Sequence, residues 1–255
     1  MRLRVTMLGS GTSTGVPVIG CTCAVCQSPS ARNHRMRPGL KLETENGTLL
    51  VDTPTDLRAQ ALRFGLDRVD GVLFTHSHAD HLFGLDEVRI FNFRQRSPIP
   101  CYGSAQTLAA IRRVFAYVFD NGQEGGGKPK LELIEIREPF QVLGLHVVPV
   151  PVWHGEMEVF GYRFGDFAYV TDCNRIPEES LGLLEGVSVL ILDALRYRPH
   201  PTHFSVAEAV AQARRIGAAR TVLTHLAHEV DYDAPQEPLP EGVELGYDGL
   251  VFDIG

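Results

Sequence analysis

Four side chains that bind metal ions lie within six consecutive residues of this chain: His76, His78, Asp80 and His81. They directly follow the apolar run 71–75, which is typical of a buried strand. Zinc, manganese and iron all accept neutral imidazole and carboxylate ligands. Because adjacent Asp80 and His81 cannot easily share the geometry set by the two earlier histidines, the spacing predicts two ions side by side. A polar turn with clustered histidines is the alternative.

Three further ligands are expected because each stands where a β-like run stops: His154, Asp172 and His225. If these strands run in related directions, their ends converge on the turn that holds the first cluster. A bridging carboxylate would allow two dications to sit ~3.5–4 Å apart. We assign one ion to His76, His78 and His154, the other to Asp80, His81 and His225, and the bridge to Asp172.

A second metal site is indicated by three cysteines at C-x-C-x-x-C spacing, Cys21, Cys23 and Cys26. Three thiols can hold one tetrahedral zinc and need a fourth ligand from elsewhere. His228, which is three residues past His225, is the first candidate, and His34 and His200 are the alternatives. A site closed by four protein ligands would be a structural zinc. Three reduced thiols without metal is the competing interpretation.

The elements that position these residues are mostly short strands separated by turn signals. Helical patterns occur at Asp56–Phe64, Ala105–Phe119 and Val206–Ile216, and Ser205 with Glu208 has the spacing of a capping box at the start of the last one. Many strands with a few helices predict two packed sheets covered by helices, in one domain of residues 1–255. The strands are expected at Leu3–Leu8, Gly47–Asp52, Gly71–Thr75, Ile99–Tyr102, Leu131–Ile136, Leu145–Pro149, Val159–Phe164, Ala168–Asp172, Val187–Asp193, Thr221–Thr224 and Leu250–Ile254.

Bulk composition is that of a soluble globular protein, with 44% hydrophobic and 22% charged residues. The net charge of −7 disfavours broad electrostatic binding to nucleic acid. No apolar run approaches the ~20 residues that span a bilayer, and the first residues do not resemble a signal peptide. Five cysteines without a disulfide pattern indicate a cytoplasmic protein, in which Cys101 and Cys173 are expected to be small buried residues. Residues 121–128 are expected to form a loop, either a mobile connection or a lid.

Taken together, these motifs resemble the metallo-β-lactamase superfamily. Within it, the chain is similar to the phosphoribosyl 1,2-cyclic phosphate phosphodiesterases of the carbon–phosphorus lyase pathway, and the similarity runs almost from Met7 to residues 246–249. The segments that carry this closer similarity are residues 15–17 ahead of the cysteines, Thr202–Ser205 and Leu223–His228.

The resemblance implies an α/β fold, an αββα sandwich, with a dinuclear manganese or zinc centre and a homodimer. It also implies that His228 completes the structural zinc site and that His203 lies near the leaving group. Two segments depart from the pattern. Residues 51–54 replace an Asp-Ala-Gly turn, although Asp52 can still orient the metal loop, and residues 85–94 differ from the pathway enzyme, which leaves the substrate open.

The chemistry expected of this site is hydrolysis of a small phosphodiester, because two dications that share a water supply a bridging hydroxide at neutral pH. We assign His203 and Asp80 as catalytic residues, with His203 as the acid that protonates the leaving alkoxide. A surface histidine before a helix cap is the other interpretation of His203. Four arginines are candidates to clamp a terminal phosphate or to form a solvated basic face: Arg35, Arg37, Arg196 and Arg198.

Competing functions use the same ligands. An RNA 3′-end phosphodiesterase is disfavoured by the net charge, and a carbon-ester hydrolase, either a thioesterase or a lactonase, is permitted by the metals alone. A redox di-iron protein would be better served by a carboxylate at His78. A non-catalytic binding module would lack one or more of the dinuclear ligands.

Overall fold

Two seven-stranded mixed sheets form the centre of the protein, whose computed structural model describes residues 2–120 and 127–255. The first sheet has the order β14-β1-β2-β3-β4-β5-β6 and the second the order β13-β12-β11-β10-β9-β8-β7. The strands of the first sheet are β1 (Leu3–Gly9), β2 (Gly39–Thr44), β3 (Gly47–Val51), β4 (Gly71–Leu73), β5 (Ile99–Gly103), β6 (Leu131–Glu135) and β14 (Val251–Ile254). Those of the second are β7 (Phe140–Val142), β8 (Leu145–His154), β9 (Met157–Phe164), β10 (Phe167–Val170), β11 (Val189–Asp193), β12 (Arg220–Thr224) and β13 (Val243–Leu245).

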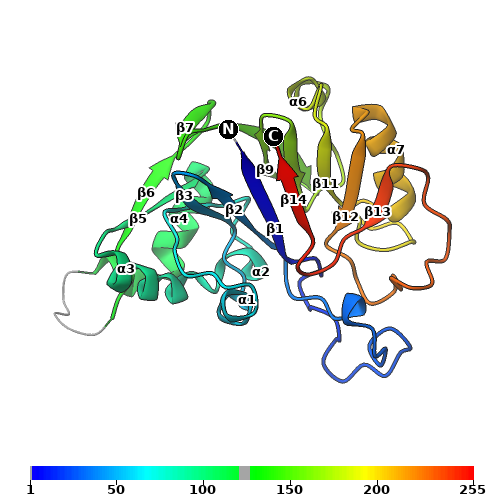
Figure 1. Cartoon of the computed structure of the whole chain (residues 1–255), viewed down its shortest axis with the longest axis horizontal. Coiled ribbons are helices and arrows are strands. Elements are labelled where there is room, and N and C mark those ends of the chain that lie inside the picture. The colour runs from blue at the N-terminus through cyan, green and yellow to red at the C-terminus, as the bar shows by residue number, and fades with distance from the viewer. Residues whose placement is uncertain (1, 121–126) are drawn as a thin grey trace.

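Both sheets change from antiparallel to parallel pairing part-way across. In the first sheet β14, β1, β2 and β3 pair antiparallel, and β3 to β6 pair parallel. In the second, β7 to β10 pair antiparallel and β10 to β13 pair parallel. Parallel neighbours end at the same edge of a sheet, so each sheet presents several carboxyl ends together. The strands that carry the two termini, β1 and β14, lie side by side in the middle of the molecule (Figure 1).

Helices cover the outer face of each sheet, and three clusters of buried apolar side chains hold the four layers together. One cluster lies between the sheets and includes Met7, Tyr162 and Val222. A second packs α6 and α7 on the second sheet, and a third packs α1 to α5 on the first. The αββα sandwich predicted from the sequence is confirmed. The helices are η1 (Ala31–Asn33), α1 (Leu57–Arg63), α2 (Ala79–Leu82), η2 (Leu85–Val88), α3 (Arg89–Gln95), α4 (Ala105–Val114), α5 (Ala116–Phe119), α6 (Glu178–Leu183) and α7 (Val206–Ile216).

The predicted helix ends were right where a capping group marks them. The capping box at α7 is present, with Ser205 accepting from the Glu208 backbone and the Glu208 side chain accepting from Ser205. The single helix predicted for Ala105–Phe119 is wrong, because it breaks at Phe115, whose φ and ψ are −106° and 40°. The short helices α2, α3 and α6 were not predicted.

Three strands were missed, and some predicted strand ends shift. The segment β2 carries Lys41 and Glu43 among its residues, but this lysine is only 8% exposed because its ammonium pairs with Glu43 and donates to the Phe64 carbonyl. The other two, β7 and β13, have three residues each. The predicted strand Leu145–Pro149 in fact continues to His154. The loop predicted at residues 121–128 lies outside the described residues, except for 127 and 128.

Among the described residues, no helix is long and apolar enough to cross a membrane.

Candidate metal centre

Three histidines from the two sheets form the first group of potential ligands. His76 follows β4, His78 is the N-cap of α2, and His154 is the last residue of β8. One ring nitrogen from each lies within 4.8 Å of the others. The ring centroids of His78 and His154 are 5.1 Å apart, although 76 residues separate them in the chain. The structure therefore brings together the three side chains assigned to one ion.

Two carboxylates and two histidines form the second group: Asp80, His81, Asp172 and His225. Asp172 lies at its centre, with Oδ1 3.2 Å from His81 Nε2 and Oδ2 3.3 Å from His225 Nε2. The same Oδ2 atom is 3.9 Å from His76 Nε2, in the first group. A carboxylate that reaches both groups has the placement that a bridging ligand requires.

The hydrogen bonding and the pKa shifts of these histidines suit side chains that bind cations. Buried Nε2 atoms of His76, His81 and His225 have no hydrogen-bond partner among the described residues, and such atoms are rare unless they bind something. Burial lowers the pKa of His76 well below its usual value, which leaves the imidazole neutral and able to ligate. Burial also opposes charge on His81, but Asp172, Asp52 and Asp80 raise its pKa well above the usual value. The three carboxylates that favour a proton on His81 would equally favour a cation at this place.

Neighbouring groups fix the orientation of the ligands, as is usual at metal sites. Asp52 accepts from His81 Nδ1 at 2.7 Å and from both the backbone and the hydroxyl of Thr75 at 2.8 Å. Its carboxylate is completely buried, and it orients the metal loop as the sequence predicted. On the other side of the centre, the Thr202 carbonyl accepts from His154 Nδ1 at 2.8 Å. In both histidines Nδ1 is occupied, so Nε2 is the nitrogen left for a metal.

Left-handed backbone occurs at three of these positions, each just past the end of a strand. Asp52 follows β3 with φ 65°, Asp172 follows β10 with φ 54°, and His225 follows β12 with φ 61°. Residues with a β-carbon pay roughly 1–2 kcal/mol for this conformation, and functional sites are where such strain is retained. The sharp turns point these side chains back over the strand ends and into the centre.

His203 lies beside the two groups. Its ring centroid is 4.6 Å from those of both His154 and His225, and its Nε2 is 4.0 Å from Asp172 Oδ2. Sequence reasoning missed its partner, Asp193, whose Oδ1 accepts from His203 Nδ1 at 3.1 Å. Burial lowers the pKa of His203, but the carboxylates of Asp193, Asp172 and Asp80 together more than offset this effect and raise it to about 9. Asp193 ends β11 as Asp172 follows β10, so the position at a strand end was the available signal.

The cysteine site is also assembled. Nδ1 of His228 lies 3.2 Å from Sγ of Cys21 and 3.5 Å from Sγ of both Cys23 and Cys26. The backbone N–H of Cys26 does most to lower the pKa of Cys23, to about 6, which favours the thiolate that a metal binds. Of the two alternative fourth ligands, His34 bonds to the Ser28 carbonyl and His200 lies against His203. His228 is therefore the residue positioned to complete the site.

Residues 48–226 match the model of the β-lactamase superfamily domain, which covers more than half of the chain. The chain belongs to the metallo-β-lactamase superfamily. It is thus a hydrolase of that fold with residue clusters suited to metal binding. The family resemblance inferred from the sequence is confirmed.

Three relatives of this metallo-β-lactamase-fold protein refine the picture. A diphosphatase from the PhnP family, seen in a crystal structure, is 40% identical in sequence to this chain, and the two structures superpose with a TM-score of 0.93. The match covers all of this chain and 98% of the diphosphatase chain. The octanoyltransferase of Porphyromonas gingivalis is 38% identical over 97% of the chain, which spans about half the length (51%) of that relative. Zinc-bound PqqB of Methylobacterium extorquens is 20% identical over 98% of this chain and all of its own, with a TM-score of 0.80, and it shares the fold.

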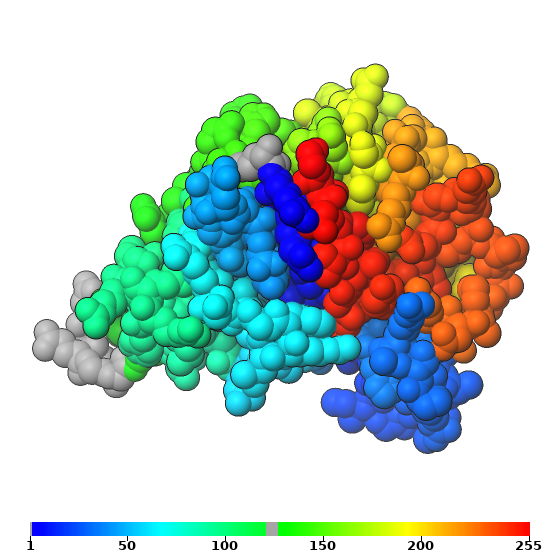
Figure 2. Space-filling model, viewed as in Figure 1, coloured from blue at the N-terminus to red at the C-terminus, as the bar shows by residue number. Residues whose placement is uncertain are grey.

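The cysteine cluster projects from one end of the metallo-β-lactamase fold. Figure 2 shows this early segment, in blue, standing out beside the orange C-terminal third that supplies His228. Regular structure between Gly9 and Gly39 is limited to the three-residue helix η1 and isolated bridges. A bound ion would therefore be a main source of local order in this segment.

Replacing Cys23 by serine is expected to release one zinc per chain and to lower the melting temperature by roughly 5 °C or more, because binding free energy at a closed site is folding free energy. The measurements are metal analysis by mass spectrometry and thermal unfolding. Cys101→Ala is the matched control, because Cys101 is a buried thiol that belongs to none of the potential metal-ligand groups among the described residues. A Cys23→Ser protein that keeps its zinc and melts unchanged would show that the thiol site is wrong.

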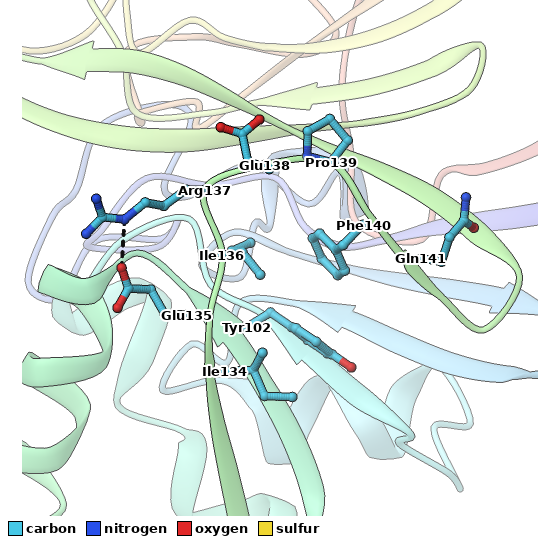
Figure 3. Close-up of a pocket in the computed structure, with 9 residues that line it drawn as sticks. All are labelled: Tyr102, Ile134, Glu135, Ile136, Arg137, Glu138, Pro139, Phe140 and Gln141. Carbon is cyan, nitrogen blue, oxygen red and sulfur yellow. Dashed lines mark hydrogen bonds and ion pairs between the residues drawn. The ribbon is translucent and has the colours of Figure 1, made fainter.

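A separate pocket of about 530 Å³ opens where β6 turns into β7. Figure 3 shows Tyr102 and Phe140 facing each other within it, and their rings stack with centroids 5.1 Å apart. Glu135, Arg137 and Glu138 form a charged rim. None of its nine lining residues belongs to a metal-ligand cluster, so this pocket is not the reaction centre.

Proposed function

We propose that the protein is a metal-dependent phosphodiesterase that acts on a small, cyclic phosphodiester, such as phosphoribosyl 1,2-cyclic phosphate. The observation that carries this proposal is the His203–Asp193 pair. His203 lies beside the two assigned ligand groups, and the Asp193 carboxylate holds its Nδ1; although His203 also belongs to two further groups that could hold a metal, we assign it the role of the acid. Alkoxide is a poor leaving group, and a phosphodiesterase needs an acid at this position. The 40% identity to a PhnP-family diphosphatase gives further support for chemistry at phosphorus.

His76, His78 and His154 would hold one cation, Asp80, His81 and His225 the other, and Asp172 would bridge them. Zinc or manganese bound there would lower the pKa of a water to supply the nucleophile and would neutralise charge on the phosphoryl oxygens. The imidazoles His81 and His225 hold the pKa of Asp80 well below its usual value against the opposing effect of burial. Asp80 is therefore ionised at neutral pH, and its carboxylate can act as a metal ligand or as a hydrogen-bond acceptor.

His203 completes the reaction at the leaving group. As the bond between phosphorus and the leaving oxygen breaks, the proton on His203 Nε2 passes to that oxygen, and the product is an alcohol. Asp193 keeps the other ring proton on Nδ1 and stabilises the imidazolium before transfer. Asp193 itself is held by the backbone N–H groups of Asp172 and Phe204, at 3.1 and 3.0 Å. The acid and the bridging carboxylate are thus positioned by one buried side chain.

Two other reactions remain as outcomes of the test. An RNA 3′-end phosphodiesterase would use the same residues, but a net charge of −7 disfavours a long anionic substrate. A thioesterase would need the metals, but a thiolate leaving group gains little from an acid at His203. A lactonase releases an alkoxide, as a phosphodiesterase does, and the choice of substrate separates the two. The octanoyltransferase relative is about twice as long as this chain, so its activity does not assign a reaction to the matching half.

The test is a substrate panel with the purified protein loaded with manganese or with zinc. It contains cyclic and linear phosphodiesters, a thioester, a lactone and a short RNA. We expect cyclic phosphodiesters to give the highest kcat/KM, by roughly tenfold or more over the carbon esters and RNA. A higher kcat/KM for the thioester or the lactone would overturn the proposal in favour of acyl chemistry, and a higher value for RNA would assign a nuclease.

A further inference from the structure

His225 differs from other buried histidines of the metal centre in how its ring is held. The Nδ1 atoms of His81 and His154 are hydrogen-bonded to neighbouring groups, which fixes those two rings. Nδ1 of His225 is buried and has no hydrogen-bond partner among the described residues, and the Asp193 Oδ1 atom is 3.9 Å away from it. Histidines that bind metals almost always donate this second ring N–H. The direction of the His225 ring must therefore come from its backbone and from packing.

The backbone of His225 needs support from its surroundings. The residue follows β12 in the left-handed conformation, with φ 61°, which persists in a residue with a β-carbon only where the rest of the structure imposes it. Three positions further on is His228, the fourth ligand of the cysteine site. We call residues 225–230 the histidine segment, and residues 10–38, between β1 and β2, the thiol segment. Whatever fixes the histidine segment also fixes the direction of His225.

The start of the thiol segment is hydrogen-bonded to the histidine segment. The Leu226 N–H donates to the Ser10 carbonyl at 2.9 Å, and the Leu226 carbonyl accepts from the Thr12 N–H at 3.2 Å. On the other side, the Ala227 N–H donates to the Leu195 carbonyl at 2.8 Å. The residue directly after His225 is thus held on both its N–H and its carbonyl by the thiol segment.

Arg35 makes a second connection between the two segments. The sequence offered it as a phosphate ligand, but it is 2% exposed, and its guanidinium donates to the Ala227 carbonyl at 3.3 Å and to the Val230 carbonyl at 2.9 Å. These carbonyls lie on either side of His228 in the chain. The Arg35 backbone is itself paired with Val16 in both directions, at 2.7 and 2.8 Å. Arg35 therefore fixes the histidine segment to the middle of the thiol segment.

Asn33 extends this connection. Its side chain is completely buried, and its Oδ1 accepts from Arg35 Nη2 at 3.1 Å and from the Tyr232 N–H at 2.9 Å. Its amide group donates to Asp231 Oδ1 at 2.8 Å. Gly11 permits the close approach, because a β-carbon there would lie 2.8 Å from that of Arg35. The two segments thus form one hydrogen-bonded unit.

A zinc ion at the cysteine site would close this unit. Nδ1 of His228 lies 3.2 Å from one thiol sulfur and 3.5 Å from the other two. Donor atoms around a tetrahedral zinc are ~3.6 Å apart, given Zn–S and Zn–N bonds of about 2.3 and 2.1 Å, so the ion fits with little displacement of either segment. Because the thiol segment has little regular structure, the order of its hydrogen bonds to the histidine segment depends on the ion.

We propose that Arg35 and the cysteine site position His225, so that the second ion of the dinuclear centre binds tightly only while zinc occupies the cysteine site. Arg35 is a positioning residue, because it acts through the histidine segment and is not itself a metal ligand. The inference rests on the two metal sites assigned above and is independent of the substrate. The other ion, assigned to His76, His78 and His154, has no ligand in the histidine segment and should bind as before.

Manganese binding measures this effect without turnover. Thiolates select zinc, whereas carboxylates and imidazoles also accept manganese, so manganese reports on the dinuclear centre. A mild chelator empties that centre, and mass spectrometry checks that one zinc per chain remains. In an EPR titration we then expect the wild type to bind two exchange-coupled manganese ions. In Cys23→Ser, the second dissociation constant should rise by about 5- to 150-fold and the first should stay unchanged.

Variants of Arg35 test the positioning role while all four ligands of the cysteine site are kept. Arg35→Met removes the donors and should weaken the second manganese ion in protein that still holds its zinc. Arg35→Lys keeps a cationic donor and should restore part of the affinity. Ile111→Ala, at a buried position of α4 in the helical layer of the first sheet, is the control for general destabilisation and should change neither dissociation constant. Equal weakening of both ions in Arg35→Met would overturn the proposal.

The wild-type protein supplies a test that does not depend on the folding of a variant. Coupling between two binding sites is reciprocal, so saturating manganese should strengthen zinc binding at the cysteine site, measured by chelator competition, by the same factor. His225→Ala should abolish this effect. The same zinc affinity with and without manganese would overturn the proposal. If the coupling is observed but no phosphodiester is hydrolysed, the proposed reaction fails and the positioning role stands.

Discussion

Replacing Asp172 by alanine is expected to release at least one metal ion per chain and to lower kcat/KM by roughly 10³-fold or more. Asp172 lies 3.2 Å from His81, 3.3 Å from His225 and 3.9 Å from His76, so its carboxylate reaches both ligand groups. Without it, two dications would repel each other with no anion between them, and their stabilisation of the reaction would be lost. Metal analysis and steady-state kinetics measure the two effects.

Two further variants make this result specific. Asp172→Asn keeps the size of the side chain, and asparagine tolerates the left-handed backbone at this position, so it removes mainly the charge. We expect it to lose metal as the alanine variant does. Asp166→Asn, at the exposed opposite end of β10, should keep both ions and full activity. Full occupancy of both ions in Asp172→Asn would contradict the bridging assignment.

Replacing His203 by alanine is expected to leave the metal content unchanged while slowing alkyl phosphodiesters by ~10²–10⁴-fold. The reason is the proton on Nε2, which an alkoxide needs on departure. Bis(p-nitrophenyl) phosphate releases a phenolate that is stable without protonation, so its hydrolysis should slow far less. The ratio of the two rates, measured with the same protein preparation, isolates the acid role from substrate binding.

His146→Ala is the matched control for this prediction, because that exposed histidine lies near the other end of β8, away from the ligand groups. It should change neither rate. Equal losses on both substrates in His203→Ala would point to substrate positioning instead of acid catalysis. No loss of rate on either substrate would support the alternative interpretation of His203, a histidine before a helix cap with no catalytic role.

The ligand groups could be predicted from sequence because their geometry is local or follows from strand ends. His76, His78, Asp80 and His81 are neighbours in the chain, and His154, Asp172 and His225 each close or follow a strand-like run. Asp193 closes a predicted strand in the same way, but it was missed because it binds a histidine that lies outside the ligand set. A search for polar side chains at strand ends identifies candidate metal ligands. It does not identify the residues that hydrogen-bond to catalytic side chains.

Other features needed three-dimensional information. The hydrogen-bond partners of Arg35, Arg37 and Arg198 are carbonyls and carboxylates up to 195 positions away in the chain. The strand β2 was hidden by Lys41, whose burial depends on Glu43 and on the distant Phe64 carbonyl. In each case, charged residues that are usually exposed are neutralised or oriented by tertiary contacts, which sequence patterns do not report.

The left-handed turns at Asp52, Asp172 and His225 also restrict how this chain can change during evolution. Most substitutions at these positions have two harmful effects. They remove the functional side chain, and they place a residue with a β-carbon in an unfavourable backbone conformation. Glycine and asparagine relieve the second problem only. In a lineage that no longer needs the activity, we therefore expect glycine or asparagine to appear at these three positions first. The two-sheet fold would stay intact in such proteins.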